Sequence, residues 1–405
     1  MAGLQNEHII CISSIDWDPI WTRKQQVMSR LPASTTILYV EPPITLLSPF
    51  KDPGTWKKWR SWFRGIRCLK ENIFLYSPPV VLPFGNKYRA VNRINQWLIS
   101  IFVKTAVSRL ELKNPIIWTY MPNSVDLADK LGQRKLLVYD CVDEHSEYTG
   151  FIDRQVMTDM ERELMGRCDI VFVTAQGLYE AKKDYTETIY FLPNAADVPH
   201  FLTAQDPETQ IPEEIARVPG PIVGFVGVIQ DWIDLDLIRK AALAYPAYSF
   251  VMIGPTGAGV DVSELKSLPN VYFLGRKDVR DLPAYMKAFD VCINPFKLNR
   301  LTDKVSPLKF YEYLASGKPI VSVNMPGVAG FSEVIEIAGS TEEFIKGIGR
   351  AIRDDTPEKR DNRIKTALEN SWDSRVEYMT EKIIEKMSSK KNTGNGGNII
   401  VNNQT

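Results

Sequence analysis

The chain has 405 residues, of which 44% are hydrophobic and 24% are charged, and its 49 Lys and Arg balance its 49 Asp and Glu. This composition is that of a globular protein rather than a disordered one, and the absence of a net charge gives no support to nucleic-acid binding. The length is enough for two domains, each with its own hydrophobic core.

Cysteine usage and the apolar runs indicate a reduced environment and no membrane span. The start of the chain lacks the apolar run of a secretion signal. The longest apolar stretch, residues 97–107, is interrupted by Lys104 and is too short to cross a bilayer. The cysteines have no paired spacing, which predicts reduced thiols rather than a disulfide or zinc framework: Cys11, Cys68, Cys141, Cys168 and Cys292. We therefore expect a cytoplasmic protein that is soluble or at most peripheral to a membrane.

The first half of the chain alternates between apolar strands and helices. We predict strands at 8–15, 35–43, 114–120, 135–142, 168–175 and 187–195, and helices at 21–31, 125–131 and 153–166. Continuous apolar strands separated by helices predict a parallel, doubly wound α/β sheet.

A basic region interrupts this alternation. Between Lys51 and Lys113 there are thirteen Lys and Arg but three acidic residues, and Trp and Phe are interleaved with the basic side chains. Such a mixture is typical of a surface that binds anionic membranes, and this is the function we expect for it. Two alternatives stay open: a solvated basic face beside an ordinary core helix, and a site for single-stranded nucleic acid.

The strand-and-helix alternation restarts after a stretch rich in Pro and Glu. We place a linker at 206–220 between an N-terminal domain, 1–205, and a C-terminal domain, 221–370. The second domain has predicted strands at 221–229, 248–255, 270–276, 291–296 and 320–323, with helices at 235–244, 281–289 and 341–352. We expect a last helix at 371–387, which could pack back on the first domain, and a disordered tail at 388–405.

The segment 293–322 of the second domain carries the most informative pattern. Pro307 is expected to open a helix that Gly317 ends, with Lys309 in its first turn and Glu312 in its second. A helix N-terminus beside an ammonium group suits a phosphate, and a carboxylate one turn further on can bind a pair of sugar hydroxyls. Diphosphate and ribose together describe a nucleotide sugar. An ordinary surface pair of Lys309 and Glu312 at i, i+3 is the structural alternative.

Several stretches resemble glycosyltransferases of the GT-B fold, of the family-four type that builds cell-surface polysaccharides. In the second half these stretches are GFVGVIQDW, NVYFLGRKDVRDLPAYMKAFDVCINPF and PLKFYEYLASGKPIVS. In the first half SSIDWDPIWTRKQQ, LYVEPP and VYDCVDEHSEYTGF are similar to a subgroup that includes teichuronic-acid-type enzymes. The resemblance covers residues 9–384.

The resemblance implies a fold, a reaction and a donor site. The fold would be two facing Rossmann-like α/β domains with an interdomain cleft, the first binding the acceptor and the second a UDP- or GDP-type sugar. The sugar would move to a cell-surface glycan or lipid-linked acceptor without a metal or other cofactor, at the inner face of the cytoplasmic membrane. Glu312 would bind the ribose hydroxyls, Lys309 and the N–H groups around Leu308 the diphosphate, Gly227 would lie near the phosphates, and Arg276 near the base.

One departure concerns the donor side. Lys304 stands where many members of the family have a second Glu, and no Arg or Lys follows Gly227 where a basic pair is usual. We expect Lys304 and Lys309 to supply positive charge for the phosphates instead. Whether transfer retains or inverts configuration stays open. A nucleotide-sugar epimerase of the same fold and a catalytically degenerate nucleotide-binding subunit are the alternative functions.

The candidate catalytic base lies in the first domain. The strand at 135–142 delivers Asp140, Asp143 and Glu144 to the carboxyl edge of the sheet, and His145 follows. By resemblance to xanthan-type glucuronosyltransferases we assign the base to Asp143; capping of a helix is the alternative role.

Asp18 and Arg23, after the first strand, are expected on the acceptor side, although Asp18 could instead cap the following helix. The two Asp-x-Asp sequences, Asp16 to Asp18 and Asp234 to Asp236, are too short to indicate a metal site, and three histidines in all make a histidine cluster improbable. We therefore predict no metal.

Overall fold

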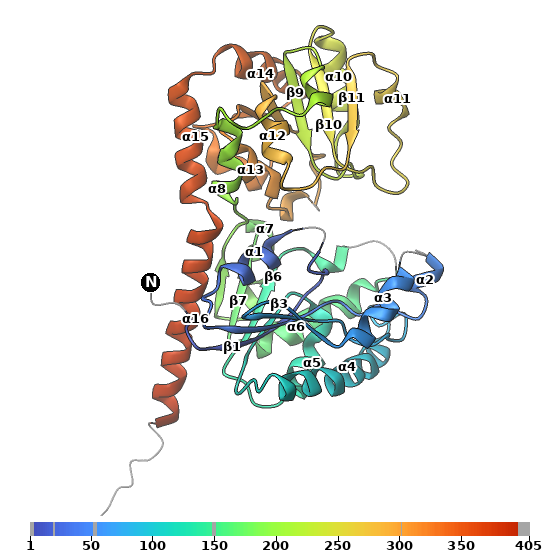
Figure 1. The fold of residues 1–405 in the computed structure, drawn as a ribbon, viewed down its shortest axis with the longest axis vertical. Coiled ribbons are helices and arrows are strands. Elements are labelled where there is room, and N and C mark those ends of the chain that lie inside the picture. Colours follow the sequence, from blue (N-terminus) through green and yellow to red (C-terminus); the bar gives the residue numbers. More distant parts are fainter. Residues whose placement is uncertain (1–3, 19–20, 52–54, 148–150, 301, 396–405) are drawn as a thin grey trace, which may run out of the picture. The chain divides into compact units, whose positions relative to one another are not determined.

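The computed structural model describes residues 4–18, 21–51, 55–147, 151–300 and 302–395 (Figure 1). The chain divides into two compact units. Unit 1 contains the residues up to 174 together with 178–192 and the chain from 376 onward, and unit 2 contains 175–177 and 193–375.

Unit 1 is built on an eight-stranded sheet in the order β3-β4-β2-β1-β5-β6-β7-β8. All pairs of neighbouring strands are parallel except β3 and β4, which are antiparallel. The strands are β1 (His8–Ile12), β2 (Thr36–Val40), β3 (Ile66–Lys70), β4 (Ile73–Tyr76), β5 (Ile116–Thr119), β6 (Leu137–Cys141), β7 (Ile170–Val173) and β8 (Ile189–Phe191). The central strands β1, β5, β6 and β7 are buried along their length apart from the half-buried His8, as continuous apolar runs predict.

The helices of unit 1 alternate with its strands along the chain. They are α1 (Arg23–Arg30), α2 (Ser48–Lys51), α3 (Trp56–Ser61), α4 (Arg89–Arg109), α5 (Val125–Lys130) and α6 (Arg154–Arg167); α7 (Gln176–Lys182) begins in unit 2 and ends in unit 1. The basic region, for which no strand was predicted, supplies β3 and β4 as well as α3 and the whole of α4, and it begins at the last residue of α2. Strand β3 is mostly exposed, so its sequence lacks the apolar run of a buried strand.

Unit 2 is a six-stranded, fully parallel sheet in the order β11-β10-β9-β12-β13-β14. Its strands are β9 (Ile222–Val226), β10 (Ser249–Ile253), β11 (Val271–Gly275), β12 (Val291–Asn294), β13 (Ile320–Val323) and β14 (Glu336–Ala338). Its helices are α8 (Val198–Leu202), α9 (Glu213–Ala216), α10 (Leu235–Ala244), α11 (Ser263–Lys266), α12 (Leu282–Lys287), α13 (Leu308–Ala315), α14 (Thr341–Arg353) and α15 (Pro357–Glu369). One hydrophobic core joins sheet and helices.

The boundaries of the units differ from the predicted domain limits. Residues 193–220, including the predicted linker at 206–220, belong to unit 2, because Phe201, Ala204 and Ile215 are buried in its core. The last helix, α16 (Trp372–Asn395), runs eight residues past the predicted limit at 387, and its part beyond residue 375 groups with unit 1. The end of the predicted disordered tail, 396–405, lies outside the described residues.

Candidate functional site

The sheet of unit 2 has one point at which the order of its strands reverses. From β9 the chain moves outward to β10 and β11, and then returns to the other side of β9 as β12. In sheets of this type ligands bind beyond the carboxyl ends of the strands at such a switch point. The loops after β9 and β12 therefore frame the candidate site, and the helix α13 follows β12.

Helix α13 ends where the sequence predicts and begins one residue later than predicted. Pro307 is the N-cap rather than the first helical residue, and Leu308 opens the helix. Ser316 is the C-cap, and Gly317 follows with φ +70°, the left-handed conformation that glycine adopts most easily. The side chain of Arg363 donates to the carbonyl oxygen of Gly317 at 2.9 and 3.0 Å, which fixes this end of the helix.

Tyr313 attaches α13 to the end of β9. The backbone N–H of Val226 donates to the Tyr313 hydroxyl at 2.7 Å, and that hydroxyl lies 3.2 Å from the carbonyl oxygen of Val226, to which it donates. Burial raises the pKa of Tyr313 well above its usual value, so the phenol stays protonated and keeps both bonds. The second half of α13 is thus held against the end of β9, directly before Gly227. The sequence analysis did not identify Tyr313, because a tyrosine on the apolar face of a helix looks like an ordinary core residue.

Lys309 and Glu312 contact each other on α13. The Nζ atom of Lys309 lies 2.6 Å from Oε2 of Glu312. Glu312 is buried, with 5% of its surface exposed, whereas Lys309 is partly exposed. Burial raises the pKa of Glu312, and the charge and hydrogen bond of Lys309 oppose that rise. A buried carboxylate held by one lysine is a costly arrangement for a helix surface, where exposed pairs are the norm.

Two glycines bring the loops after β9 and β10 into close contact. A Cβ atom at Gly254 would lie 1.9 Å from the carbonyl oxygen of Gly227, so no other residue fits at 254. The loops are also joined by backbone hydrogen bonds, from Ile229 to Pro255 at 3.0 Å and from Gly257 to Ile229 at 2.8 Å. Gly254 was not among the predicted site residues. Its signal in the sequence was a glycine directly after an apolar strand, the same position that Gly227 has.

The other predicted donor residues lie beyond the same edge of the sheet. Arg276 is exposed directly after β11. Lys277, next to it, pairs with Glu214 and lies 5.2 Å from the ring centre of Tyr285, so it is committed to the protein. Lys304 ends a short 3-10 helix, Thr302–Lys304, in the loop between β12 and α13.

In unit 1 the candidate base Asp143 lies in a buried charged cluster after β6. Asp143 itself is half-buried, and its charge acts on Lys24 of α1 and on His145. Burial lowers the pKa of His145 to about 4, although the negative charge of Asp143 acts to raise it. The imidazole is therefore neutral at pH 7. Burial also lowers the pKa of Lys24, while Asp143 and Asp140 oppose this. The N-cap of the next α-helix is Asp153, which accepts from Val156 N–H at 3.0 Å, so that role does not fall to Asp143.

The two residues predicted on the acceptor side have different environments. Asp18 is exposed, and the N-cap of α1 is Thr22 rather than Asp18. Arg23 is 2% exposed: its Nε donates to both carboxylate oxygens of Asp140, at 2.9 and 3.0 Å, and its Nη1 donates to the carbonyl oxygen of Leu192 at 3.0 Å. Arg23 therefore lies in the interior and holds α1 on β6.

No group of three or more His, Cys, Asp and Glu side chains that could hold a metal ion occurs among the described residues.

The sequence is similar to those of known glycosyltransferases. Residues 220–354 match the family model "Glycosyl transferases group 1". The chain is 31% identical over 227 residues to TuaH of Bacillus subtilis (strain 168), which is named as a candidate teichuronic acid biosynthesis glycosyltransferase. That match covers 53% of this chain and 56% of TuaH, so the chain spans about half the length of this relative.

Solved structures resemble the chain over most of its length. Sucrose-phosphate synthase from Thermosynechococcus elongatus has a TM-score of 0.66 at 14% identity, covering 95% of this chain and 100% of that one. An E. coli trehalose-6-phosphate protein bound with UDP-2-fluoro glucose has a TM-score of 0.67 at 11% identity, covering 93% and 99%. Anabaena HepE in complex with UDP and glucose has a TM-score of 0.61 at 15% identity, covering 95% and 100%.

These likenesses confirm the predicted fold class, GT-B, with its two Rossmann-like α/β units. The sequence resemblance to glycosyltransferases is confirmed over the segment that contains Gly227, Lys309 and Glu312. Residues 220–354 are thus a glycosyl transferases group 1 domain, carried on a chain with the GT-B fold.

Proposed function

We propose that this protein is a glycosyltransferase that moves a sugar from a UDP- or GDP-type nucleotide sugar to a cell-surface glycan or a lipid-linked acceptor. The observation that carries the proposal is the pair Lys309 and Glu312 at the start of α13, beyond the switch point of a sheet whose sequence matches the glycosyl transferases group 1 model. Two of the similar structures hold UDP or a UDP-sugar, which supports a donor of this class.

On the donor side, the N-terminal N–H groups of α13, from Leu308 onward, and the ammonium of Lys309 meet the diphosphate. Lys304 adds positive charge from the preceding loop. Glu312 accepts hydrogen bonds from the ribose hydroxyls through Oε1, or through Oε2 once Lys309 turns to the phosphates. The leaving diphosphate is stabilised by these groups, and we propose that no metal takes part.

The loops after β9, β10 and β11 complete the donor site. The close contact between Gly254 and Gly227 holds the first two loops together at this edge of the sheet, where we propose that their backbone meets a phosphate or the ribose. We propose that Arg276, which is exposed directly after β11, contacts the base.

On the acceptor side, Asp143 takes the proton of the attacking hydroxyl if transfer inverts configuration. Its neighbour His145 is neutral at pH 7 and cannot compensate the charge of Asp143, whereas Lys24 lies near enough for the two charges to interact. Asp18 is accessible to an acceptor, whereas Arg23 acts through the position of α1.

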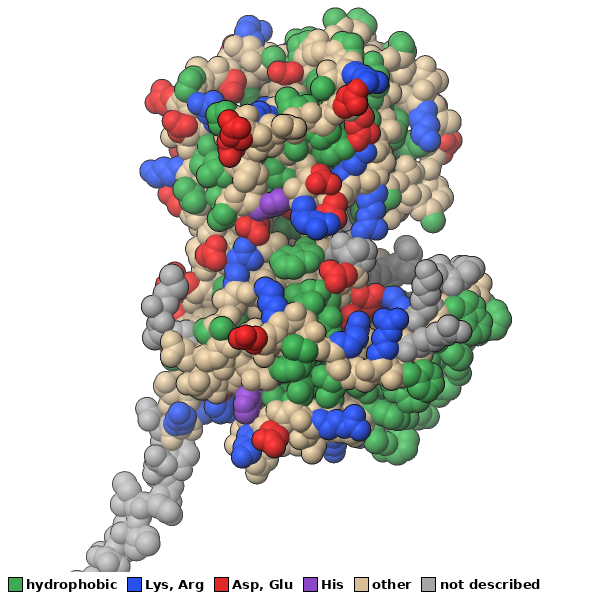
Figure 2. All heavy atoms as spheres, viewed as in Figure 1, with side chains coloured by type: hydrophobic (Ala, Val, Ile, Leu, Met, Phe, Trp, Pro, Cys, Tyr) green, Lys and Arg blue, Asp and Glu red, His purple; other side chains and the backbone are tan. Residues whose placement is uncertain are grey.

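We further propose that the basic region from Lys51 to Lys113 binds an anionic membrane surface, at the inner face of the cytoplasmic membrane. Large hydrophobic side chains are exposed along it, among them Trp56, 51% exposed, Phe63, 79% exposed, and Trp97, 54% exposed. Figure 2 shows hydrophobic side chains gathered at the lower right, over the part of unit 1 that carries α2, α3 and α4. No described helix is both long enough and apolar enough to cross a bilayer.

A thermal-shift screen over UDP-, GDP- and dTDP-sugars tests the donor site. At least one nucleotide sugar should raise the melting temperature, by an amount that grows with ligand concentration. The variants Lys309→Ala and Glu312→Ala should lose this stabilisation, while Asp143→Asn, in the other unit, should keep it. Equal shifts in all variants would remove Lys309 and Glu312 from the donor site.

Transfer to acceptor, followed as release of the nucleoside diphosphate, tests Asp143. The Asp143→Asn variant should bind donor normally and lose transfer by about 10²–10⁴-fold, the usual contribution of a general base. A variant with full activity would exclude Asp143 as the base.

A further inference from the structure

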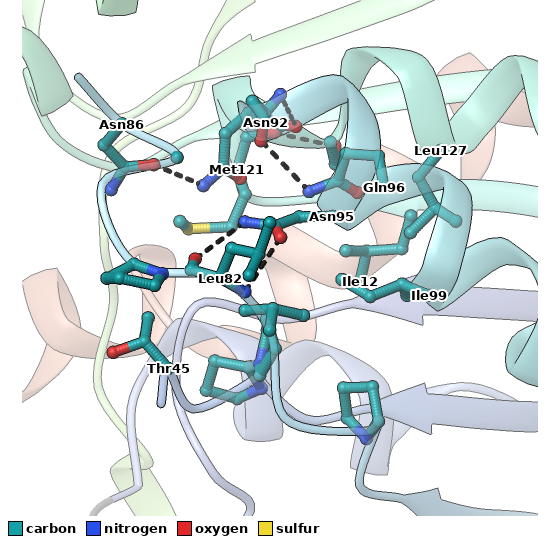
Figure 3. Close-up of a pocket in the computed structure, with 18 of the residues that line it drawn as sticks. Ile12, Thr45, Leu82, Asn86, Asn92, Asn95, Gln96, Ile99, Met121 and Leu127 are labelled. Carbon is teal, nitrogen blue, oxygen red and sulfur yellow. Dashed lines mark hydrogen bonds between the residues drawn. The ribbon is translucent and has the colours of Figure 1, made fainter. Parts of the chain in front are cut away.

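Unit 1 contains a preformed pocket at its own switch point. The order of the strands reverses at β1, which lies between β2 and β5, and the pocket lies beyond the carboxyl ends of these three strands. Its volume is about 320 Å³, within the range of small-molecule sites. Figure 3 shows its walls: the ends of the strands with Ile12 and Met121, the loop with Leu82 and Asn86, and the first turns of α4.

In its first turns, helix α4 buries polar side chains and exposes apolar ones. Asn92, Asn95 and Gln96 are 2–5% exposed and line the pocket, whereas Ile94 and Trp97 between and beside them are 52% and 54% exposed. A helix that buries amides and exposes isoleucine and tryptophan contradicts the usual pattern, and such contradictions are expected at functional sites.

The buried amides are committed to the backbone and to each other. Asn95 accepts from Leu82 N–H and donates to the Leu82 carbonyl, both at 2.9 Å. Asn92 donates to the carbonyl of Asn123 at 2.8 Å, and Asn123 donates to Asn86 at 2.7 Å. These bonds hold the walls of the pocket in place and engage most of the amide groups named here. Among the described side chains that line it, the buried polar atom left without a hydrogen bond is Oε1 of Gln96.

The walls of the pocket carry almost no charge. No Lys or Arg lines it among the described residues, and its one ionisable side chain, Glu41, accepts from the Ser77 hydroxyl at 2.5 Å and pairs with Arg67. A phosphate or a uronic acid would find no cation here. The ligand that fits these walls is uncharged.

The mouth of the pocket is apolar and exposed. Leu47, Leu82 and Phe151 line the pocket and are 38%, 41% and 51% exposed. Phe84, which packs edge-to-face on Phe151 with ring centres 5.0 Å apart, has φ +65°, a strained conformation for a residue with a side chain. In sequence the apolar mouth adjoins the exposed hydrophobic residues of the basic region, since Leu82 belongs to that region and Leu47 lies four residues before it.

We propose that this pocket binds the aliphatic chain of a lipid-linked acceptor. The proposal rests on the proposed function and specifies what kind of acceptor the protein takes. A pyranose ring would need several free polar partners, whereas Asn92 and Asn95 are engaged with the backbone and Oε1 of Gln96 is a single acceptor. An aliphatic chain needs none, gains from apolar walls, and enters from the surface through the apolar mouth.

Alkyl glucosides with the same sugar and chains of increasing length, used below the concentration at which they form micelles, are suitable probes. Titration calorimetry should give one saturable site whose affinity rises about fourfold per added methylene until the pocket is full, while glucose alone should not bind. Leu47→Arg and Leu82→Arg, which place a charge at the mouth, should weaken the longest chain at least tenfold. Ile94→Arg places the same charge at an exposed position of α4 outside the pocket, and it should leave the affinity for the longest chain unchanged. The Gln96→Leu variant should bind the alkyl chains at least as well as the wild type.

Three outcomes would overturn the proposal: affinity independent of chain length, equal weakening by Ile94→Arg, or loss of chain binding in Gln96→Leu. The assay needs neither donor nor transfer, so it is read beside the nucleotide-sugar thermal shift of the same preparations. Nucleotide stabilisation without chain binding rejects the lipid pocket alone. Chain binding without nucleotide stabilisation rejects the proposed function of the donor site.

Discussion

Glu312 illustrates the conflict between stability and binding that a single residue can contain. Its burial raises its pKa, which means that ionising it costs folding free energy, and Lys309 returns only part of that cost. A chain selected for stability alone would have an apolar residue at this position, as buried ion pairs replaced by apolar groups often show. The cost is understandable if the ionised carboxylate serves a ligand.

His145 gives a residue-scale prediction on pH. Burial lowers its pKa from 6.5 in the unfolded chain to about 4 in the folded protein, with Asp143 and Glu144 opposing and Lys24 and Lys182 reinforcing the shift. Between pH 6.5 and 4 the imidazole therefore takes up a proton in the unfolded chain but not in the folded protein. The free energy of unfolding consequently falls as the pH falls through this window, by at most about 1.4 kcal/mol per pH unit.

Urea unfolding between pH 7 and pH 4.5 measures this effect. The His145→Gln variant should be less stable than the wild type at pH 7, and the difference between the two should shrink or reverse as the pH falls. Arg154→Gln, a change of an exposed residue in the same unit, is the control and should follow the wild-type slope. Parallel curves for His145→Gln and wild type would show that His145 is not held neutral.

At the scale of elements, one buried ion pair fixes helix α1 on strand β6. Arg23 and Asp140 are 117 residues apart in sequence, and both side chains are almost inaccessible, at 2% and 0%. Removing one partner would leave a buried charge uncompensated. We predict that Arg23→Met lowers the free energy of unfolding by about 3–5 kcal/mol, and that the double variant Arg23→Met, Asp140→Leu recovers much of this loss.

Chemical denaturation of the two variants checks this prediction. The exposed pair of Arg154 and Glu147 supplies the matched control, since Arg154→Met should cost less than about 1 kcal/mol. If Arg23→Met were no more costly than Arg154→Met, the ion pair would not be what holds α1.

The elements also show what the sequence could and could not predict. Buried parallel strands such as β6 and β12 are continuous apolar runs, and α13 has Pro307 and Gly317 at its ends, so these were predicted with small errors in their limits. Strand β3 was missed because an exposed, antiparallel edge strand has no such run. The first turns of α4 bury Asn92, Asn95 and Gln96, which the spacing of apolar residues does not indicate.

The donor-side candidates lie at one edge of the sheet, on the loops after its strands and on α13, because they follow successive strands, and this order can be seen in the sequence. Contacts between distant residues were not predictable. The approach of Gly254 to Gly227 depends on which strands are neighbours, and the attachment of Tyr313 to Val226 depends on how α13 crosses the sheet. The same holds for Arg23, because its partner Asp140 belongs to a strand that only the fold brings near. The sequence therefore placed Arg23 on the acceptor side, whereas the structure buries it in an ion pair.

At the scale of the whole molecule, the distribution of apolar side chains is uneven. Eleven of the eighteen large hydrophobic side chains that are exposed among the described residues lie between 46 and 101, together with exposed cations. Scattered exposed apolar residues are normal, but a concentration of them beside basic residues is characteristic of a surface that binds anionic lipid.

Sedimentation with lipid vesicles tests this surface on the complete chain. The protein should bind vesicles that contain anionic lipid and release them as salt is raised, because charge attraction is screened within about 10 Å at 0.1 M salt. The triple variant Arg64→Gln, Arg93→Gln, Lys104→Gln should bind about 10²-fold more weakly, at about 1 kcal/mol for each charge near the surface.

Phe63→Ser with Trp97→Ser should reduce binding to neutral and anionic vesicles alike, since it removes apolar contact rather than charge. A triple variant of exposed cations in unit 2, Arg217→Gln, Lys240→Gln, Lys365→Gln, changes the net charge equally and should bind as the wild type does. If both triple variants lost binding to the same extent, net charge rather than the surface of unit 1 would govern membrane association.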